Sequence, residues 1–393
     1  MVITIPLWRQ RKKAMKKKLQ DYEQSKPEQL TLFEILSPED KKYSNTIELY
    51  DFIPKYVWGK VERIQGQFLP SLEREFECRG IRYRVKIRPA RMDDPTDTEK
   101  KEKDYYPGKR EELIEDALRK LICEGQGVFL DDQAGVCFTL TKLQEELINM
   151  GHSYSKDEIK DGLLICNRTG LDVYSADNNT VVSANIFTTL GLTSRNDWED
   201  HADTKCFVRF NPLVTSGIKN KTFRQIDYET AMKYKCVIAR QLHKRLSHHY
   251  TQASVLEKYQ ILLSTIIRDF GLTAYERLRD NLRDVKIALD EMLVKEIDVE
   301  ENGRMVKKEV GIVASYKIEK KFCSENKRKM VDALITVVTY RNFNGEMKIA
   351  NAKQAEIQNP SKQEKQNKKL RYSTEVTGWS SISSILPKVI RKK

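Results

Sequence analysis

The stretch TKLQEELINMGHSYSKDEIKDGLLICNRTG, residues 141–170, decides the fold that this sequence predicts. Its first half has the pattern of a short helix with one apolar face. Thr141 can cap the amino end of that helix and Gln144 can complete a capping box. Gly151 can end it, because glycine readily takes the positive φ angle that follows a last helical turn. This half therefore predicts one helix that stops at a turn.

The second half of the stretch repeats the arrangement. Ser155 and Glu158 have the spacing of a second capping box, and Gly170 marks the end of the helix that follows them. Only a few residues separate the two helices. Two short helices joined in this way indicate a helix-turn-helix, which in DNA-binding proteins presents its second helix to the major groove.

The segments on either side extend this motif. Before it, KREELIEDALRKLICEG predicts a helix, and GVCFTL predicts a short strand. The apolar residues on one face of that helix are Leu113, Ala117, Leu118 and Leu121. After it, LDVYS and TVVSANIF predict strands on either side of the turn ADNN. The resulting order of elements, in which a hairpin follows the helix-turn-helix, predicts a winged-helix domain over residues 108–192.

A second unit of the same kind is predicted over residues 205–322, after the polar joint TSRNDWEDHADTK. CFVRF predicts a strand, YETAMKYKCVIARQLHKRLSHHYTQ a long helix, and YQILLSTIIRDFG a shorter helix that Gly271 ends. TAYERLRDNLRDVKIALDEML predicts a further long helix. VKEIDVE and VGIVASYKI then predict a hairpin, because Asn302-Gly303 between them favours a tight turn with two positive φ angles.

The fold class indicated by these patterns is α+β and mainly helical, with two tandem winged-helix domains between flexible basic N- and C-terminal tails. Residues 1–40 are predicted to form the basic leader, and residues 41–107 a small region of unspecified fold with a charged linker. KRKMVDALITVVTYRNF predicts a closing helix or strand. Residues 323–393 form a C-terminal extension, which from Asn351 onward is rich in Gln, Lys, Asn and Ser and is expected to be disordered.

Composition favours an intracellular protein that binds a polyanion. The chain has 393 residues and a net charge of +13, and a basic surface attracts nucleic acid through counterion release. The seven cysteines are scattered and form no C-x-x-C pair, which is typical of reduced thiols in a cytosol. No apolar run approaches the ~18 residues of a membrane span, so no membrane partner is expected.

The helix after Gly271 carries the main candidates for DNA contact. Arg279, Arg283 and Lys286 lie on a second face, beside the apolar stripe that contains Leu278, Leu282, Val285, Leu289 and Met292. Guanidinium groups can reach guanine edges or phosphates in a major groove. The other candidates for DNA contact are Tyr275, Arg277, Arg240, Lys244, Arg245 and Arg304. The alternative is an ordinary solvated helix face, in which Asp280 and Asp284 offset the charge.

The helix that starts at Ser155 is a weaker candidate, because Asp157 and Glu158 place acid at its start. Charge reversal at Lys160 is therefore expected to cost less DNA affinity than charge reversal at Arg283. We expect no catalytic residue, metal or cofactor, and hence no enzyme. The sequence contains no G-x-x-x-x-G-K-[ST] loop, and the spacing supports no pair of nucleophile and base.

A short apolar motif interrupts the polar leader. It consists of Gln29, Leu30, Thr31, Leu32 and Phe33. Either this segment packs on its own protein, or it binds another one. In the second case Leu32 and Phe33 would fill an apolar pocket, with Gln29 at the pocket edge.

Taken together, these features resemble iteron-binding plasmid replication initiators, the Rep proteins of the TrfA-like, twin winged-helix type. The segment ARQLHKRLSHHYTQAS, residues 239–254, is similar to a long-helix signature of such proteins, and residues 29–33 are similar to the peptide by which bacterial proteins bind the sliding clamp. Thr31 departs from the usual Ser or Asp but keeps a hydroxyl group.

The resemblance implies a bacterial cytoplasmic protein, associated with nucleoid or plasmid, that binds repeated double-stranded origin DNA and recruits host replication proteins. Its implied partners are the sliding clamp, the replicative helicase and the host initiator, with a monomer–dimer equilibrium. The alternative function is a winged-helix transcriptional regulator of a plasmid or phage, and a nuclease or relaxase is a third.

Overall fold

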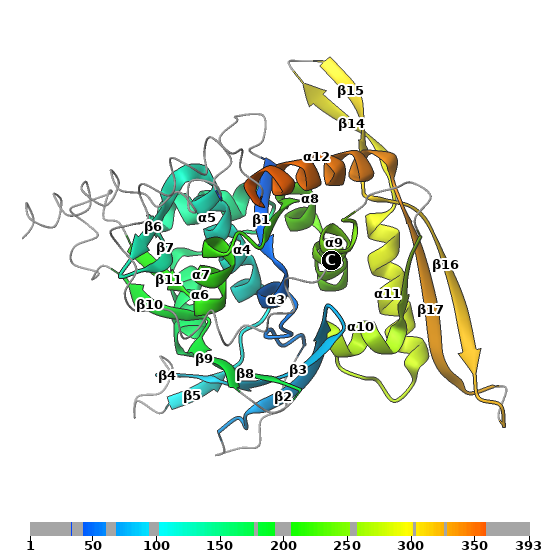
Figure 1. Cartoon of the computed structure of the whole chain (residues 1–393), viewed down its shortest axis with the longest axis horizontal. Helices are drawn as coiled ribbons and strands as arrows, with labels where there is room; N and C mark the ends of the chain where they lie inside the picture. The colour runs from blue at the N-terminus through cyan, green and yellow to red at the C-terminus, as the bar shows by residue number, and fades with distance from the viewer. Residues whose placement is uncertain are drawn as a thin grey trace, which may run out of the picture. The chain divides into compact units, whose positions relative to one another are not determined.

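The computed structural model divides the chain into two compact units, each built from three separate segments (Figure 1). The first unit comprises Met1–Ile47, Ala90–Thr169 and Asn185–Lys233; the second comprises Glu48–Pro89, Gly170–Ala184 and Tyr234–Lys393. The residues that the structure describes are 33, 42–59, 68–93, 102–176, 180–192, 206–251, 258–301, 304–325 and 328–358. The domains predicted from the sequence were instead contiguous segments.

The first unit contains the stretch that opened the sequence prediction. Its helices are α4 (Lys109–Leu121), α5 (Leu140–Asn149), α6 (Lys156–Arg168), α7 (Pro212–Lys219) and α8 (Tyr228–Lys233). One sheet has the order β10 (Phe187–Gly191), β11 (Cys206–Phe210), β7 (Gln133–Phe138) and β6 (Gly127–Leu130). Two further pairs are β1 (Tyr43–Ile47) with β12 (Phe223–Asp227), and β4 (Ala90–Asp93) with β5 (Glu102–Tyr105). The apolar face predicted for α4 is fully buried.

The helix-turn-helix of α5 and α6 follows the predicted local chemistry closely. The backbone N–H of Ser155 donates to the Glu158 carboxylate at 2.8 Å, and the Glu158 N–H donates to the Ser155 hydroxyl at 3.2 Å, so the capping box is confirmed. Gly151 has φ +83° just past α5, as its role at the helix end requires. The cap of α5 is Thr139 rather than Thr141, since the Thr139 hydroxyl accepts from the Lys142 N–H at 3.1 Å.

The second unit contains a sheet with the order β2 (Leu72–Cys78), β3 (Ile81–Arg88), β8 (Gly170–Ser175) and β9 (Thr180–Asn185). The predicted hairpin of residues 170–185 therefore exists, but it pairs with strands from the region whose fold the sequence left unspecified. Apolar side chains on one face of this sheet hold the pairing. They are Phe76, Val85, Ile87, Leu171 and Val173, all fully buried. Burial of this face explains why the hairpin belongs to the second unit.

The rest of the second unit combines helices with a three-stranded sheet. Its helices are α3 (Glu48–Asp51), α9 (Val237–His249), α10 (Leu263–Asp269), α11 (Leu278–Met292) and α12 (Arg341–Gln358). The sheet has the order β13 (Lys258–Leu262), β17 (Met330–Thr339) and β16 (Val313–Phe322). A separate ribbon of β14 (Lys295–Glu301) and β15 (Arg304–Val310) extends away from it (Figure 1).

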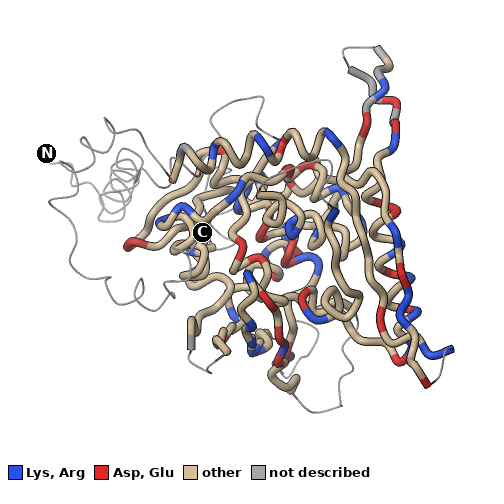
Figure 2. The backbone as a smooth tube through the Cα atoms, turned by 45° about the vertical axis from the view of Figure 1, so that its right-hand side comes forward, with Lys and Arg blue, Asp and Glu red and all other residues tan. Residues whose placement is uncertain are grey.

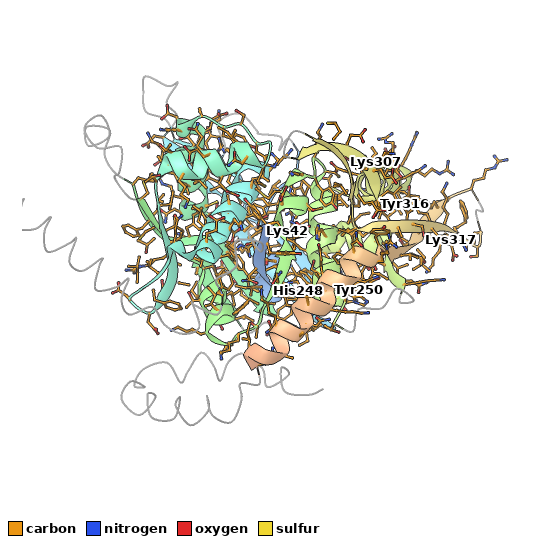
Figure 3. All side chains as sticks on the ribbon, turned by 90° about the horizontal axis from the view of Figure 1, so that it is seen from above. Lys42, His248, Tyr250, Lys307, Tyr316 and Lys317 are labelled. Atoms are coloured by element: carbon orange, nitrogen blue, oxygen red, sulfur yellow. The ribbon has the colours of Figure 1, made fainter. Side chains whose placement is uncertain are left out.

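One apolar core joins α9, α10, α11 and α12 to the sheet. Leu282, Val285 and Leu289 of α11 pack with Ile335 and Val337 of β17 and with residues of α9. Near this core, the Asn351 side chain of α12 donates to the Tyr250 carbonyl at 3.1 Å, just after α9 ends (Figure 3). The position of α11 is therefore fixed by buried contacts on one face.

Several predicted elements differ in this unit. KYQIL is a strand rather than part of a helix, because Tyr259 and Ile261 alternate with exposed Lys258 and Gln260. Tyr228–Lys233 and Val237–His249 form two helices rather than one, and the Glu291 carboxylate accepts from backbone N–H groups at the break. Helix α12 continues to Gln358, where disorder was expected. Strands and helices take up similar shares of the described residues. The prediction of a mainly helical fold therefore understates the strand content.

The predicted second hairpin also has a different partner strand. VKEIDVE pairs with residues 304–310, while VASYKIEKKF pairs with β17 to form a longer hairpin, Val313–Phe322 with Met330–Thr339. The structure thus holds two hairpins where the sequence predicted one. Of the helices described, none combines the length and apolar character needed to cross a bilayer.

Candidate nucleic-acid interface

Helix α11 places its basic residues on the face opposite the core. The stripe of Leu282, Val285, Leu289 and Met292 is buried as predicted, with Leu278 partly buried at its start. Arg279, Arg283 and Lys286 are exposed. Arg279 and Arg283 are four residues apart and therefore share one face of the helix.

The charges on this face are partly offset by neighbouring acids. The guanidinium of Arg283 lies 3.3 Å from the Asp280 carboxylate and 3.9 Å from that of Asp284, and its side chain is 67% exposed. Ion pairs this exposed contribute little to stability, so a phosphate group can compete for the guanidinium. Tyr275 is exposed, and the Asp284 carboxylate beside its hydroxyl raises its pKa. Arg277 is exposed at the position that caps α11.

The free end of the β16–β17 hairpin adds a second basic group that the sequence prediction missed. Lys320, Lys321, Arg328 and Lys329 are all exposed there. Figure 2 shows Lys and Arg positions along this end of the backbone. We call these residues, together with Phe322 at the end of β16, the hairpin tip. The Arg279 guanidinium donates to the Arg328 carbonyl at 3.0 Å, which joins the tip to the start of α11.

The hairpin is also fixed to α11 closer to the core. The Tyr316 hydroxyl of β16 donates to the Asp290 carboxylate of α11 at 2.5 Å, and burial together with this bond raises the Tyr316 pKa to about 12 (Figure 3). Next to it, Lys317 is exposed and pairs with Glu319 at 2.7 Å. The hairpin is therefore attached to α11 at two places, near its tip and near the core.

Arg240 and Lys244, predicted to touch DNA, lie inside the second unit instead. Arg240 is fully buried and donates to the Tyr234 carbonyl at 2.8 Å, and Lys244 is buried as well. Neither side chain can reach a phosphate from there. The structure therefore corrects the prediction at both positions.

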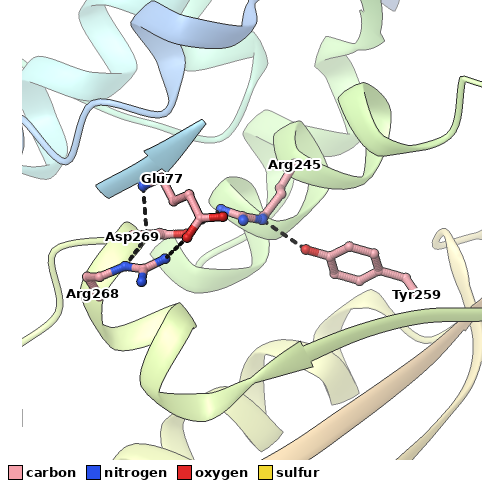
Figure 4. Close-up of polar contacts among 5 residues, drawn as sticks. All are labelled: Glu77, Arg245, Tyr259, Arg268 and Asp269. Carbon is pink, nitrogen blue, oxygen red and sulfur yellow. Dashed lines mark hydrogen bonds and ion pairs between the residues drawn. The ribbon is translucent and has the colours of Figure 1, made fainter. Parts of the chain in front are cut away.

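Arg245 has a structural role of the same kind. Its guanidinium donates to the buried Asp269 carboxylate and to the Tyr259 hydroxyl, both at 2.8 Å (Figure 4). Asp269 also accepts from Arg268 at 2.7 Å and from the backbone N–H of Glu77 at 3.2 Å. The Asp269 carboxylate thus links α9, α10 and the end of β2, and Arg245 is removed from the candidates for DNA contact.

Of the remaining predicted residues, only Phe33 can be placed. Gln29, Leu30, Thr31 and Leu32 lie outside the described residues, and the Arg304 side chain is likewise not among those described. Arg304 begins β15 directly after the two-residue connection at 302–303.

Phe33 is buried in the first unit. Its ring meets the edge of the Phe223 ring with centroids 4.9 Å apart, and its carbonyl accepts from the Asn45 side chain at 2.5 Å. The side chain has no exposed surface. For Phe33, this placement matches the alternative in which the motif packs on its own protein.

The start of α6 in the first unit is acidic, as the sequence indicated. Lys160 pairs with Asp157 at 3.2 Å, and hydrogen bonds from Ser155 lower the pKa of Glu158. In the described part of the chain, no three His, Cys, Asp or Glu side chains gather as metal ligands would.

Comparisons with known proteins identify similar structures but no family. No protein-family model matches the chain, and no curated protein matches it in sequence. Among solved structures, domains 2 and 3 of RctB are similar at 11% identity and a TM-score of 0.41, covering 78% of this chain and 99% of that one. The Pi initiator protein in complex with iteron DNA is similar at 9% identity and a TM-score of 0.37, covering 59% and 91%. An initiator, the class that the sequence resembles, is thus among the similar structures.

Proposed function

We propose that this protein initiates plasmid replication by binding repeated origin sequences, or iterons, through α11 and the hairpin tip. The observation that carries the proposal is that the exposed cations of α11 and of the hairpin tip are joined by the hydrogen bond from Arg279 to the Arg328 carbonyl. Cations gathered on one face attract the phosphate backbone through counterion release, while guanidinium groups can read guanine edges.

The order of elements supports a winged-helix domain in the second unit. Helices α9, α10 and α11, with β13 between the first two, precede the β16–β17 hairpin, and the β14–β15 ribbon is inserted before it. In this arrangement α11 would enter the major groove. We propose that α5 and α6 of the first unit form the second DNA-binding element, with weaker contacts because phosphate repels the acids at the start of α6.

Recruitment of host proteins is the other half of the proposed function. The protein would act in the bacterial cytoplasm, as a monomer or dimer, and would recruit the replicative helicase, the host initiator and, through residues 29–33, the sliding clamp. Because Phe33 packs against Phe223, binding to the clamp would first require the Phe33 ring to leave that contact.

Footprinting on DNA that flanks the gene tests the DNA-binding half. The protein should protect repeated sequences, and its affinity should fall steeply with salt because phosphate contacts release counterions. Arg283→Glu should reduce affinity more than the matched reversal Lys160→Glu. Protection that is uniform along any DNA, or the opposite ranking of the two variants, would refute the proposed interface.

A replication assay separates the initiator from its alternative. The gene with its flanking DNA should sustain a plasmid that has no other origin. Binding to repeats without replication would instead indicate a winged-helix transcriptional regulator. We propose no catalytic step, so origin DNA incubated with protein and Mg²⁺ should remain uncut.

A further inference from the structure

The hairpin tip carries an aromatic ring where the sheet no longer covers a core. Phe322 is 45% exposed at the end of β16, and Val331 is 46% exposed near the start of β17. Further along the same strands Ile318 packs against the core and Ile335 is fully buried. The hairpin thus extends past the helices that cover its inner face, so folding alone does not require an apolar residue at position 322.

The surroundings of this ring are strongly basic. Four exposed cations, Lys320, Lys321, Arg328 and Lys329, face one acid, Glu325, among the described residues 320–325 and 328–329, which gives a net charge of +3 (four minus one). A cluster of like charge around an exposed ring is unfavourable for packing against another basic protein and favourable for a polyanion. Among the candidate partners, duplex DNA offers both phosphates for the cations and stacked bases for the ring.

Two hydrogen bonds hold the backbone of the hairpin tip in position. The Cys323 N–H donates to the Lys329 carbonyl at 3.0 Å across the end of the hairpin. The bond from Arg279 to the Arg328 carbonyl ties the same end to the first turn of α11. These two bonds hold the backbone beside Phe322 close to α11, so the ring starts from a defined position relative to that helix.

We propose that Phe322 is an apolar wedge that enters the duplex at a base step next to the segment contacted by α11. This inference rests on the proposed function and extends it from binding to deformation of the DNA. Apolar side chains inserted from the minor groove unstack a base step and bend the duplex, at a cost of a few kcal/mol that added backbone contacts offset. Here the cations of the tip would supply those contacts.

The position of the tip predicts where the distortion falls. Because the tip is joined to the amino end of α11, the unstacked step should lie at one side of the protected repeat. A flexible pyrimidine–purine step there would lower the deformation energy and favour binding at a position that no side chain reads directly.

The test compares Phe322→Ala with Phe322→Leu and with the matched exposed control Val331→Ala, using the full-length protein and one repeat. Unstacking is measured by fluorescence of 2-aminopurine placed at successive steps, and bending by energy transfer between dyes at the DNA ends. Wild type, Phe322→Leu and Val331→Ala should bend the DNA and give a local 2-aminopurine signal. Phe322→Ala should lose both, while its affinity falls by less than about tenfold and its salt dependence is unchanged, since no phosphate contact is removed.

The outcomes separate this inference from the proposed function. If the wild-type protein binds no repeat, the proposed function itself fails. If it binds repeats but Phe322→Ala distorts them like wild type, the wedge is refuted while the initiator remains. A change of oligomeric state in Phe322→Ala, measured by sedimentation with DNA distortion intact, would likewise refute the wedge and assign the ring to a protein contact.

Discussion

Replacement of Phe33 by alanine distinguishes the two interpretations of the leader motif. If the ring is packed as the structure shows, the variant loses a fully buried aromatic side chain and its edge contact with Phe223. Phe→Ala changes in cores cost about 3–5 kcal/mol of unfolding free energy. For a unit of this size, 1 kcal/mol corresponds to about 2–4 °C, so the melting temperature should fall by roughly 6–20 °C.

Urea or guanidinium unfolding, followed by circular dichroism, measures this loss directly. The matched control is Ile148→Ala, because Ile148 is an apolar residue of the same unit that is 50% exposed. Surface changes of that kind are usually within about 0.5 kcal/mol of wild type. A Phe33→Ala variant as stable as the Ile148→Ala variant would refute the packed arrangement and indicate a free tether.

The same free energy sets the affinity of the motif for a sliding clamp. A clamp that binds the Phe33 ring must first release it from the first unit, which lowers the apparent affinity by about 10²- to 10⁴-fold relative to a free peptide. A peptide of residues 26–36 should therefore bind clamp more tightly than the whole protein does. Equal affinities would contradict the competition.

Three further predictions concern buried and capping groups. Asp269→Ala should cost about 3–5 kcal/mol of stability, measured by chemical unfolding, because it leaves the Arg245 guanidinium without its buried carboxylate. Ser155→Ala should cost about 0.5–2 kcal/mol at pH 7. Because the folded pKa of Glu158 lies below its ordinary value of 4.5, the stabilisation by its carboxylate is present above pH 4.5 and is lost as pH falls through the folded pKa, so wild type and Glu158→Gln should converge in stability in acid, whereas Ser155→Ala keeps the backbone N–H from which the carboxylate accepts. Burial raises the pKa of Cys78 to about 12, so mass spectrometry should find it unalkylated by iodoacetamide in the native protein at pH 8 and modified after unfolding.

Local patterns predicted the elements whose causes are local. The stripe of α11 and the capping box at Ser155 involve residues within a few turns of one another, and both are present as predicted. Gly271 has φ +61° and ends α10, also as predicted. The strand partners could not be read in this way. The strong turn signal at Asn302-Gly303 correctly predicts that a strand turns back there, yet alternation alone cannot show that VASYKIEKKF pairs with residues 330–339.

Charge was the least reliable guide to the interface. Arg240, Lys244 and Arg245 lie on α9, a helix that is buried on most of its faces. The carboxylate that pairs with Arg245 belongs to Asp269, in another helix. Sequence alone does not bring those two residues together. By contrast, the basic residues of the hairpin tip stand in the sequence as the runs EKKF and KRKM. The sequence prediction paired β16 with the wrong strand, so it did not place these two runs at the same end of one hairpin.

The rigidity of the second unit bears on how it would engage DNA. Helix α11 and strand β17 share one buried core, and the contacts from Arg279 to Arg328 and from Tyr316 to Asp290 fix the hairpin to the helix at two levels. The spacing between the helix face and the tip is therefore set by the protein. If Phe322 is the proposed wedge, DNA bound at α11 has to unstack a base step to admit the ring. Favourable contacts at α11 and at the cations of the tip would offset the free energy of deforming the DNA. Sequences that deform easily would therefore bind best.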